Sequence, residues 1–193
     1  MTEYVPNTDP PVERYSAVAR AFHWITVAFV AVQVPIGLAM VYRGYDLNIW
    51  DETTNSLYST HKLLGFILLW VVLARLAYRL VHGAPKPEPT LEPWQRTGSA
   101  IVHWLLYVLL IVLPILGWIG ISLYPALDIF GLFSLPALTS ANQELANQVL
   151  AIHASLAWLL IVLVIGHAGM ALFHYFVRKD NVLRRMLTGL PKR

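Results

Sequence analysis

The sequence predicts an all-α integral membrane protein, a bundle of four helices that each cross the bilayer. Of the 193 residues, 57% are hydrophobic and only 13% are charged, whereas an average soluble domain carries about 25% charged residues. The mean hydropathy of the chain is +0.57. Four apolar stretches are each near the roughly 20 residues that a helix needs to cross the hydrocarbon core. We expect them to form a single domain over residues 1–193.

The four predicted spans follow one another along the chain, separated by more polar connectors. They cover residues 17–41, 58–80, 99–123 and 149–177. Pro35 and Pro114 fall inside the first and third spans, where proline is tolerated in membranes and is expected to cause a local kink. The proline-rich stretch Ala84–Pro93 predicts a stiff, extended connector between the second and third spans. The sequence Ser140–Gln143 is typical of a capping box, so the fourth helix is expected to begin outside the bilayer.

The distribution of lysine and arginine predicts that both termini are cytoplasmic, since basic residues gather on the cytoplasmic side of membrane spans. The N-terminal flank, the second connector and the C-terminal tail are rich in basic residues. The first connector has Arg43, with Lys62 just inside the second span, against three acidic residues, and the third connector has no lysine or arginine. The first and third connectors are therefore expected on the opposite, periplasmic side of the membrane.

The composition also excludes several classes of protein. The chain has no cysteine, which excludes disulfides, iron–sulfur clusters, thiolate-bound haem and covalent haem attachment through a cysteine motif. The sequence pI is about 9.3, but the basic residues flank apolar spans instead of forming one patch, so nucleic acid is not an expected partner. The first sixteen residues lack the pattern of a signal peptide, so the first span is expected to be retained.

Histidines inside the spans are the strongest functional signal, because an ionisable side chain in a membrane is costly and usually functional. His153 and His167 are fourteen residues apart in the fourth span. Fourteen residues are close to four helical turns, so both rings project from nearly the same face, about 21 Å apart along the axis. This separation leaves room for two planar cofactors at different depths.

Each of these two histidines needs a partner at matching depth on a facing helix. His61 begins the second span from the periplasmic side and is expected to pair with His153. His23 lies near the cytoplasmic start of the first span and is expected to pair with His167. Two histidines at each level are too few to hold zinc without cysteine or carboxylate, whereas a haem macrocycle supplies the four remaining nitrogens. His103, in the third span at a similar cytoplasmic depth, is the main rival to His23 as fourth ligand.

The chain resembles the bacterial cytochrome b561 family, the four-helix group with two haems, and within it the superoxide oxidases. The resemblance covers nearly the whole chain. Its residues are Arg20–Trp24, His61–Gly65, His103–Tyr107, Phe130–Leu132, His153, His167, His174–Phe176 and Arg178–Asn181. It implies two haem b groups, one held by His23 and His167 near the cytoplasmic side and one held by His61 and His153 near the periplasmic side.

The resemblance also implies a substrate and an acceptor, namely periplasmic superoxide and ubiquinone. Lys62 is then the candidate residue that attracts the superoxide anion, with Arg43 as a weaker candidate; an interfacial lysine of purely structural role is the alternative for Lys62. His174 is a candidate quinone contact, or else a partner of a haem carboxylate. His103 is a possible haem or quinone contact, and His82 is expected to face solvent.

Two other functions remain open at the level of the sequence. The first is an electron conduit that anchors a dehydrogenase or hydrogenase and passes electrons from that redox partner protein to the quinone pool. The second is a four-helix transporter or scaffold without haem. The short termini offer little surface for docking a large partner, which favours the oxidase over the conduit.

Overall fold

The computed structural model describes residues 13–187 and consists of four long helices. Each is long and apolar enough to cross a membrane, with an 18-residue window of mean hydropathy between 1.9 and 2.5. The elements are α1 (Ala17–Val41), π-helical turn η1 (Tyr42–Asp46), α2 (Glu52–His82), α3 (Pro93–Leu123), β1 (Asp128–Ile129), β2 (Phe133–Ser134), α4 (Gln143–Phe173), π-helical turn η2 (His174–Arg178) and 3-10 turn η3 (Leu183–Arg185). The predicted all-α membrane bundle is confirmed. The chain up to residue 12, part of the polar stretch expected to precede the first span, and Lys192 and Arg193 of the basic tail lie outside the described residues.

The second, third and fourth helices begin earlier than hydropathy predicts, because polar capping residues or a proline set their first turns. The side chain of Asp51 accepts a hydrogen bond from the backbone N–H of Thr54 and so caps α2. Pro93 occupies the first turn of α3, a position that needs no backbone N–H. Asn142, within the predicted capping box, caps α4 through the N–H of Leu145. The α4 cap is therefore Asn142, whereas a capping box over Ser140–Gln143 would have placed it at Ser140.

The helices expose apolar side chains around most of their circumference, as expected for surfaces that face lipid. Only Ala146 and Leu160 are buried on α4. The buried apolar core lies between α2, α3 and α4 and includes Leu68, Val72, Tyr107, Leu109, Leu110, Leu113 and Leu160. Pro35 and Pro114 lie inside α1 and α3 without ending either helix. This combination of a narrow core and an apolar exterior places the chain in a lipid bilayer.

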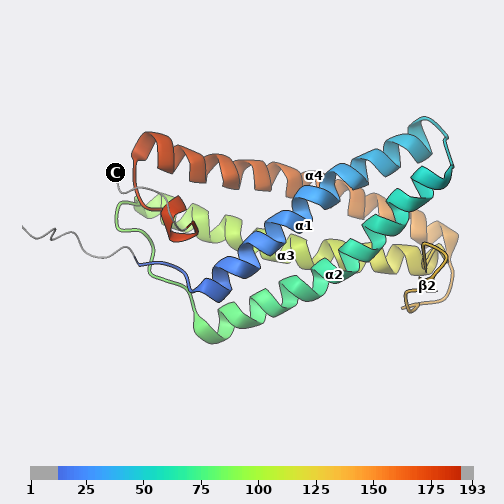
Figure 1. The fold of residues 1–193 in the computed structure, drawn as a ribbon, viewed down its shortest axis with the longest axis horizontal. Helices are drawn as coiled ribbons and strands as arrows, with labels where there is room; N and C mark the ends of the chain where they lie inside the picture. The colour runs from blue at the N-terminus through green and yellow to red at the C-terminus, as the bar shows by residue number, and fades with distance from the viewer. Residues whose placement is uncertain (1–12, 188–193) are drawn as a thin grey trace, which may run out of the picture.

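Each helix packs mainly against its neighbour in the sequence, α1 on α2, α2 on α3 and α3 on α4. Figure 1 shows that residues 13–16, the connector between α2 and α3, and the segment after η2 lie at one end of the bundle; we call this the terminal end. The connectors between α1 and α2 and between α3 and α4 lie at the other end, which we call the hairpin end because β1 and β2 form a small antiparallel hairpin there. The pairs α1–α4 and α2–α4 are not among the closely packed ones.

Candidate functional site

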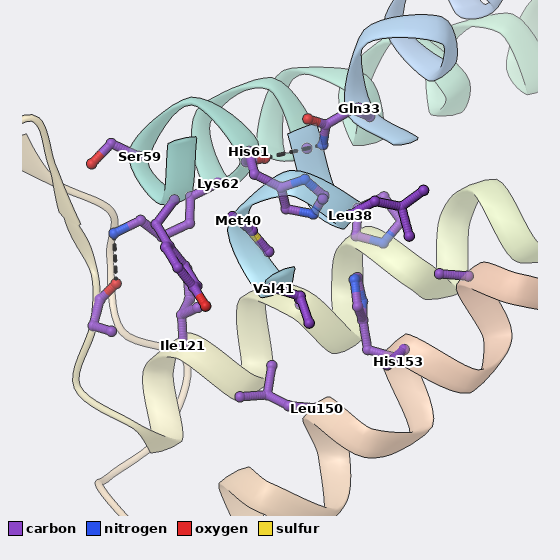
Figure 2. A pocket seen from close by; sticks show the side chains of 18 of the residues that line it. Gln33, Leu38, Met40, Val41, Ser59, His61, Lys62, Ile121, Leu150 and His153 are labelled. Atoms are coloured by element: carbon purple, nitrogen blue, oxygen red, sulfur yellow. Dashed lines mark hydrogen bonds between the residues drawn. The ribbon is translucent and has the colours of Figure 1, made fainter. Parts of the chain in front are cut away.

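His61 of α2 and His153 of α4 face each other across the bundle near the hairpin end. Their ring centroids are 6.3 Å apart and the rings are nearly perpendicular, at 81°. Figure 2 shows the two rings pointing toward one another from their separate helices. Because α2 and α4 are not closely packed, the rings face a space between helices and not a helix contact.

The distance between these rings fits one metal ion held between them. A metal–imidazole nitrogen bond is about 2.0 Å long and the ring centre lies about 1.1 Å further on, so two opposed ligands have ring centres about 6.2 Å apart. The observed 6.3 Å agrees with this value. Nowhere in residues 13–187 do three or more histidine or acidic side chains form a group that could hold a bare metal ion. The pair therefore fits an iron that brings its own equatorial ligands, as haem does.

One hydrogen bond orients the ring of His153 in the way that a metal ligand would require. Its Nδ1 lies 2.9 Å from the backbone oxygen of Leu113 on α3. A carbonyl can only accept, so Nδ1 carries the proton and Nε2 keeps the lone pair that a metal requires. Such a second partner fixes the orientation and tautomer of a histidine ligand. The Nδ1 of His61, in contrast, is buried without a hydrogen-bond partner among the described residues.

Glycines supply the room that the two rings occupy. A Cβ at Gly37 of α1 would lie 3.0 Å from Cε1 of His61, and a Cβ at Gly117 of α3 would lie 3.3 Å from Cε1 of His153. Gly65 makes room for Gln33, whose Nε2 donates a hydrogen bond of 3.0 Å to the backbone oxygen of His61. Gly65 thus admits a side chain from α1, and Gly166 and Gly169 beside His167 face open space.

A cavity of about 1410 Å³ surrounds this pair and is lined by residues of all four helices. It exceeds the roughly 300–1,000 Å³ of ordinary small-molecule pockets. The cavity continues from His61 and His153 to the hairpin end, where Lys62, Trp50 and Asp128 line it. Two of its polar groups, Oε1 of Gln33 and the hydroxyl of Tyr58, are buried without a hydrogen-bond partner among the described residues. The space is thus large enough for a macrocycle and contains polar atoms that a ligand could satisfy.

Three histidines meet nearer the terminal end. The ring centroid of His167 is 6.3 Å from that of His23 and 5.1 Å from that of His103. His23 and His167 therefore repeat the spacing of the first pair, whereas His103 is too close to His167 for a metal ion between two opposed rings. The Nδ1 of His103 donates to the backbone oxygen of Ser99 at 2.6 Å. The structure brings the two rivals, His23 and His103, to the same histidine.

Lys62 and Arg43 are both engaged in contacts at the hairpin end. The ammonium group of Lys62 donates to the backbone oxygens of Ala126, at 3.0 Å, and of Asp128, and so joins α2 to the connector that follows α3. Arg43 forms an ion pair of 2.6 Å with Asp51 and a hydrogen bond with Thr54. The pKa of Asp51 is lowered to about 2, first by the backbone N–H of Thr54 and then by Arg43. The charge of Arg43 is thereby neutralised by its neighbour.

His174 is buried at the terminal end, with 4% of its surface exposed. Its Nδ1 lies 2.5 Å from a carboxylate oxygen of Asp180, which is also buried. The contact arises because the helix widens into the π-helical turn η2 and Lys179 then takes a left-handed conformation, with φ of 55°, that turns the chain back. His82 ends α2, is exposed and stacks on Tyr78 with ring centroids 4.0 Å apart.

The sequence patterns did not point to three residues of this site, namely Gln33, Gly37 and Gly117. Gln33 carried a weak signal, because a glutamine within an apolar span must find a partner. Glycines 37 and 117 carried none, since glycine is common at ordinary contacts between membrane helices. Their role becomes visible only when the ring that each one faces is known.

Substituting Gly37 with valine is expected to displace the ring of His61 and to abolish a haem bound there. The reason is steric, since even the first carbon of the new side chain would lie 3.0 Å from the ring. The haem-to-protein ratio of the purified variant measures the effect, and about half of the wild-type value is expected. Gly98→Val is the matched control, because a Cβ at Gly98 meets no atom within 4 Å. An unchanged ratio in Gly37→Val would contradict the assigned role.

Comparison with known proteins agrees with this architecture. The prokaryotic cytochrome b561 family matches residues 14–189. Cytochrome b561 homolog 2 of Escherichia coli K12 is 33% identical over 91% of this chain and 92% of its own length, and homolog 1 of the same strain is 31% identical over 91% and 98%. A probable superoxide oxidase, CybB, of Yersinia pestis is 30% identical over 91% of this chain and 96% of its own. The chain thus belongs to the prokaryotic cytochrome b561 family of haem-binding, electron-transferring membrane cytochromes.

Proposed function

We propose that this cytochrome carries two haem b groups and transfers electrons from superoxide to ubiquinone. The observation that carries the proposal is the pair of histidine couples, His61 with His153 and His23 with His167, with the same ring spacing of 6.3 Å. His153 and His167 lie on one helix, so the two couples are at different depths of the bundle. A probable superoxide oxidase among the relatives supports the choice of donor.

His61 with His153, and His23 with His167, would hold the two haems, and haems held by two histidines each would supply one-electron transfer and leave no iron position for oxygen. In the overall reaction two superoxide anions each lose one electron and become dioxygen. Ubiquinone takes up these two electrons together with two protons and becomes ubiquinol. The oxidation step needs no proton transfer, so the chain has only to attract the anion and to bring it close to the cofactor.

Lys62 is the residue that we propose for attracting superoxide. It follows His61 directly and lines the same cavity at the hairpin end. Two of its three N–H groups are directed to backbone oxygens, which are uncharged and hold the ammonium group in place, and the third remains for an anion. Arg43 is less suited, because Asp51 already pairs with it.

His174 is the residue that we propose for contact with the quinone. It lies on the same helical segment as His167, at the terminal end, beyond the second histidine couple. Asp180 fixes the ring through Nδ1, which leaves Nε2 for a carbonyl oxygen of the quinone. His103, whose Nδ1 is held by Ser99, is a further candidate contact of the haem or the quinone near His167.

The proposed orientation places the terminal end in the cytoplasm and the hairpin end in the periplasm, within the bacterial inner membrane. Its support is the basic residues of the terminal end, which include Arg178, Lys179, Arg184 and Arg185, since such residues remain on the cytoplasmic side. Superoxide would then approach from the periplasm and quinone from the cytoplasmic half of the bilayer.

Mixing the purified protein with superoxide and a soluble ubiquinone analogue tests the proposal. We expect superoxide to reduce a b-type haem, seen as the α-band in the reduced-minus-oxidised spectrum, and one ubiquinol to form for every two superoxide anions consumed. Lys62→Gln is expected to slow haem reduction at low ionic strength, with a smaller effect at high salt, since screening weakens electrostatic attraction. A haem that dithionite reduces but superoxide does not would contradict the oxidase and leave an electron conduit.

A further inference from the structure

Two arginines of α2 lie beside the three histidines near the terminal end. An Nη atom of Arg75 is 3.1 Å from Nδ1 of His23. The guanidinium groups of Arg75 and Arg79 lie 5.2 Å and 5.9 Å from the ring centroid of Tyr107, which is buried in the core of the bundle. Both arginines are half-buried. They are one helical turn apart and therefore face the same region of the bundle.

Neither guanidinium has a carboxylate partner within residues 13–187. The ion pairs in this part of the chain are Arg43 with Asp51 and His174 with Asp180, and both lie elsewhere. Two cations one turn apart on a helix repel each other, and a cation inside a membrane protein is costly unless it is paired. The aromatic rings of Tyr107 and Trp104 offset part of this cost. A negatively charged ligand would offset the remaining cost of burying the guanidinium groups of Arg75 and Arg79.

The hydrogen bond of Arg75 adds a second argument. A guanidinium can only donate, so Nδ1 of His23 accepts and the ring proton is on Nε2. A neutral histidine that binds iron through Nε2 must instead carry its proton on Nδ1. The two arrangements exclude each other, so ligation by His23 would release Arg75 to another acceptor close by.

We propose that Arg75 and Arg79 bind the two propionate carboxylates of the haem held by His23 and His167. Arginine suits this role because its planar fork matches a carboxylate. The number of cations equals the number of carboxylates on one haem b. The inference rests on the proposed haem at this histidine couple, and it gives that haem an orientation, with its propionates toward α2.

The midpoint potential of this haem tests the assignment, since a merely structural arginine would not shift it selectively. Positive charge stabilises the reduced haem, so the substitutions Arg75→Gln and Arg79→Gln are expected to lower its potential. For the double variant we expect about a tenfold change in the ratio of oxidised to reduced haem, which is about 59 mV for a one-electron couple. Redox titration of the α-band resolves the two haems, and a His61→Ala background identifies the one that belongs to His23 and His167.

Three comparisons sharpen this experiment. The haem at His61 and His153 should keep its midpoint potential in these variants. At the other haem, Arg75→Lys should retain most of the wild-type potential. Arg96→Gln is the control and should leave both potentials unchanged. Arg96 is suitable because it donates only to backbone oxygens of the connector before α3. If the Arg75→Gln variant binds no haem at His23 and His167, the Arg79→Gln variant is used instead, because Arg79 makes no hydrogen bond to His23. In that variant the midpoint potential of this haem must be lower than in the unmodified protein.

Other outcomes would overturn the inference. Unchanged potentials in the double variant would show that the arginines do not face the propionates, and equal shifts of both haems would indicate a general structural effect. Loss of bound phospholipid phosphorus at an unchanged potential would identify a lipid phosphate as the anion. If the unmodified protein contained no haem, the proposed function itself would fail, which the spectrum of that protein shows before any variant is made.

Discussion

The His61→Ala variant is expected to bind one b-type haem for every two bound by the unmodified protein. His61 and His153 are opposed at a ring distance of 6.3 Å, which suits a single iron, and the other histidine couple lies at a different depth of the bundle. Removing a residue that only supports a metal ligand costs about 10–100-fold in metal affinity, and loss of the ligand itself should cost at least as much. The haem-to-protein ratio, measured as the pyridine haemochrome, checks this.

His82→Ala is the control for this experiment. His82 lies on the same helix, but it is exposed at the end of α2 and stacks on Tyr78, so the ratio should stay at the unmodified value. His153→Ala should reproduce the result of His61→Ala, because the two residues are predicted to serve the same iron. A full haem complement in His61→Ala would refute the pairing.

The second large effect is expected at the terminal end. The His23→Ala variant should lose the haem that we assign to His23 and His167, whereas the His103→Ala variant should keep it. Two observations disagree here. The ring distances to His167, 6.3 Å for His23 and 5.1 Å for His103, favour His23. The hydrogen bonds favour His103, because its Nδ1 is the protonated one whereas Nδ1 of His23 accepts from Arg75.

We give the ring distances more weight than the hydrogen bonds, because His23 could become a ligand with a smaller structural change than His103 could. Releasing Nδ1 of His23 takes only the rotation of an arginine side chain. Bringing His103 to ligand distance would require its ring to move away from that of His167, while its hydrogen bond to the backbone oxygen of Ser99 holds the ring where it is. Haem content together with the α-band of the two variants checks the prediction, and the reverse result, loss in His103→Ala and retention in His23→Ala, would make His103 the ligand.

The membrane bundle itself follows from the sequence, since four apolar stretches near 20 residues have few other solutions. The helix starts do not, because hydropathy detects the part that faces hydrocarbon, whereas Asp51, Pro93 and Asn142 set the ends through local hydrogen bonds and backbone geometry. The first predicted span, 17–41, coincides with α1. There the polar N-cap Ser16 directly precedes the apolar run, so both signals agree.

Some features of the candidate site likewise follow from the sequence, and others only from the tertiary structure. The fourteen-residue step from His153 to His167 is a property of helical periodicity, so the sequence alone determined that α4 presents two histidines at different depths on nearly one face. Which side chains meet them depends on contacts between segments far apart in the chain. Only the tertiary structure decided that Gly37 and Gly117 make room for the rings and that His103 comes even nearer to His167 than His23 does. It also decided that Lys62 is held by backbone oxygens, and that Arg75 and Arg79 have no acidic partner among residues 13–187. The physical reason is that a glycine, a backbone carbonyl or an unpaired charge acquires its role from what lies across the bundle, and spacing along one helix does not encode that.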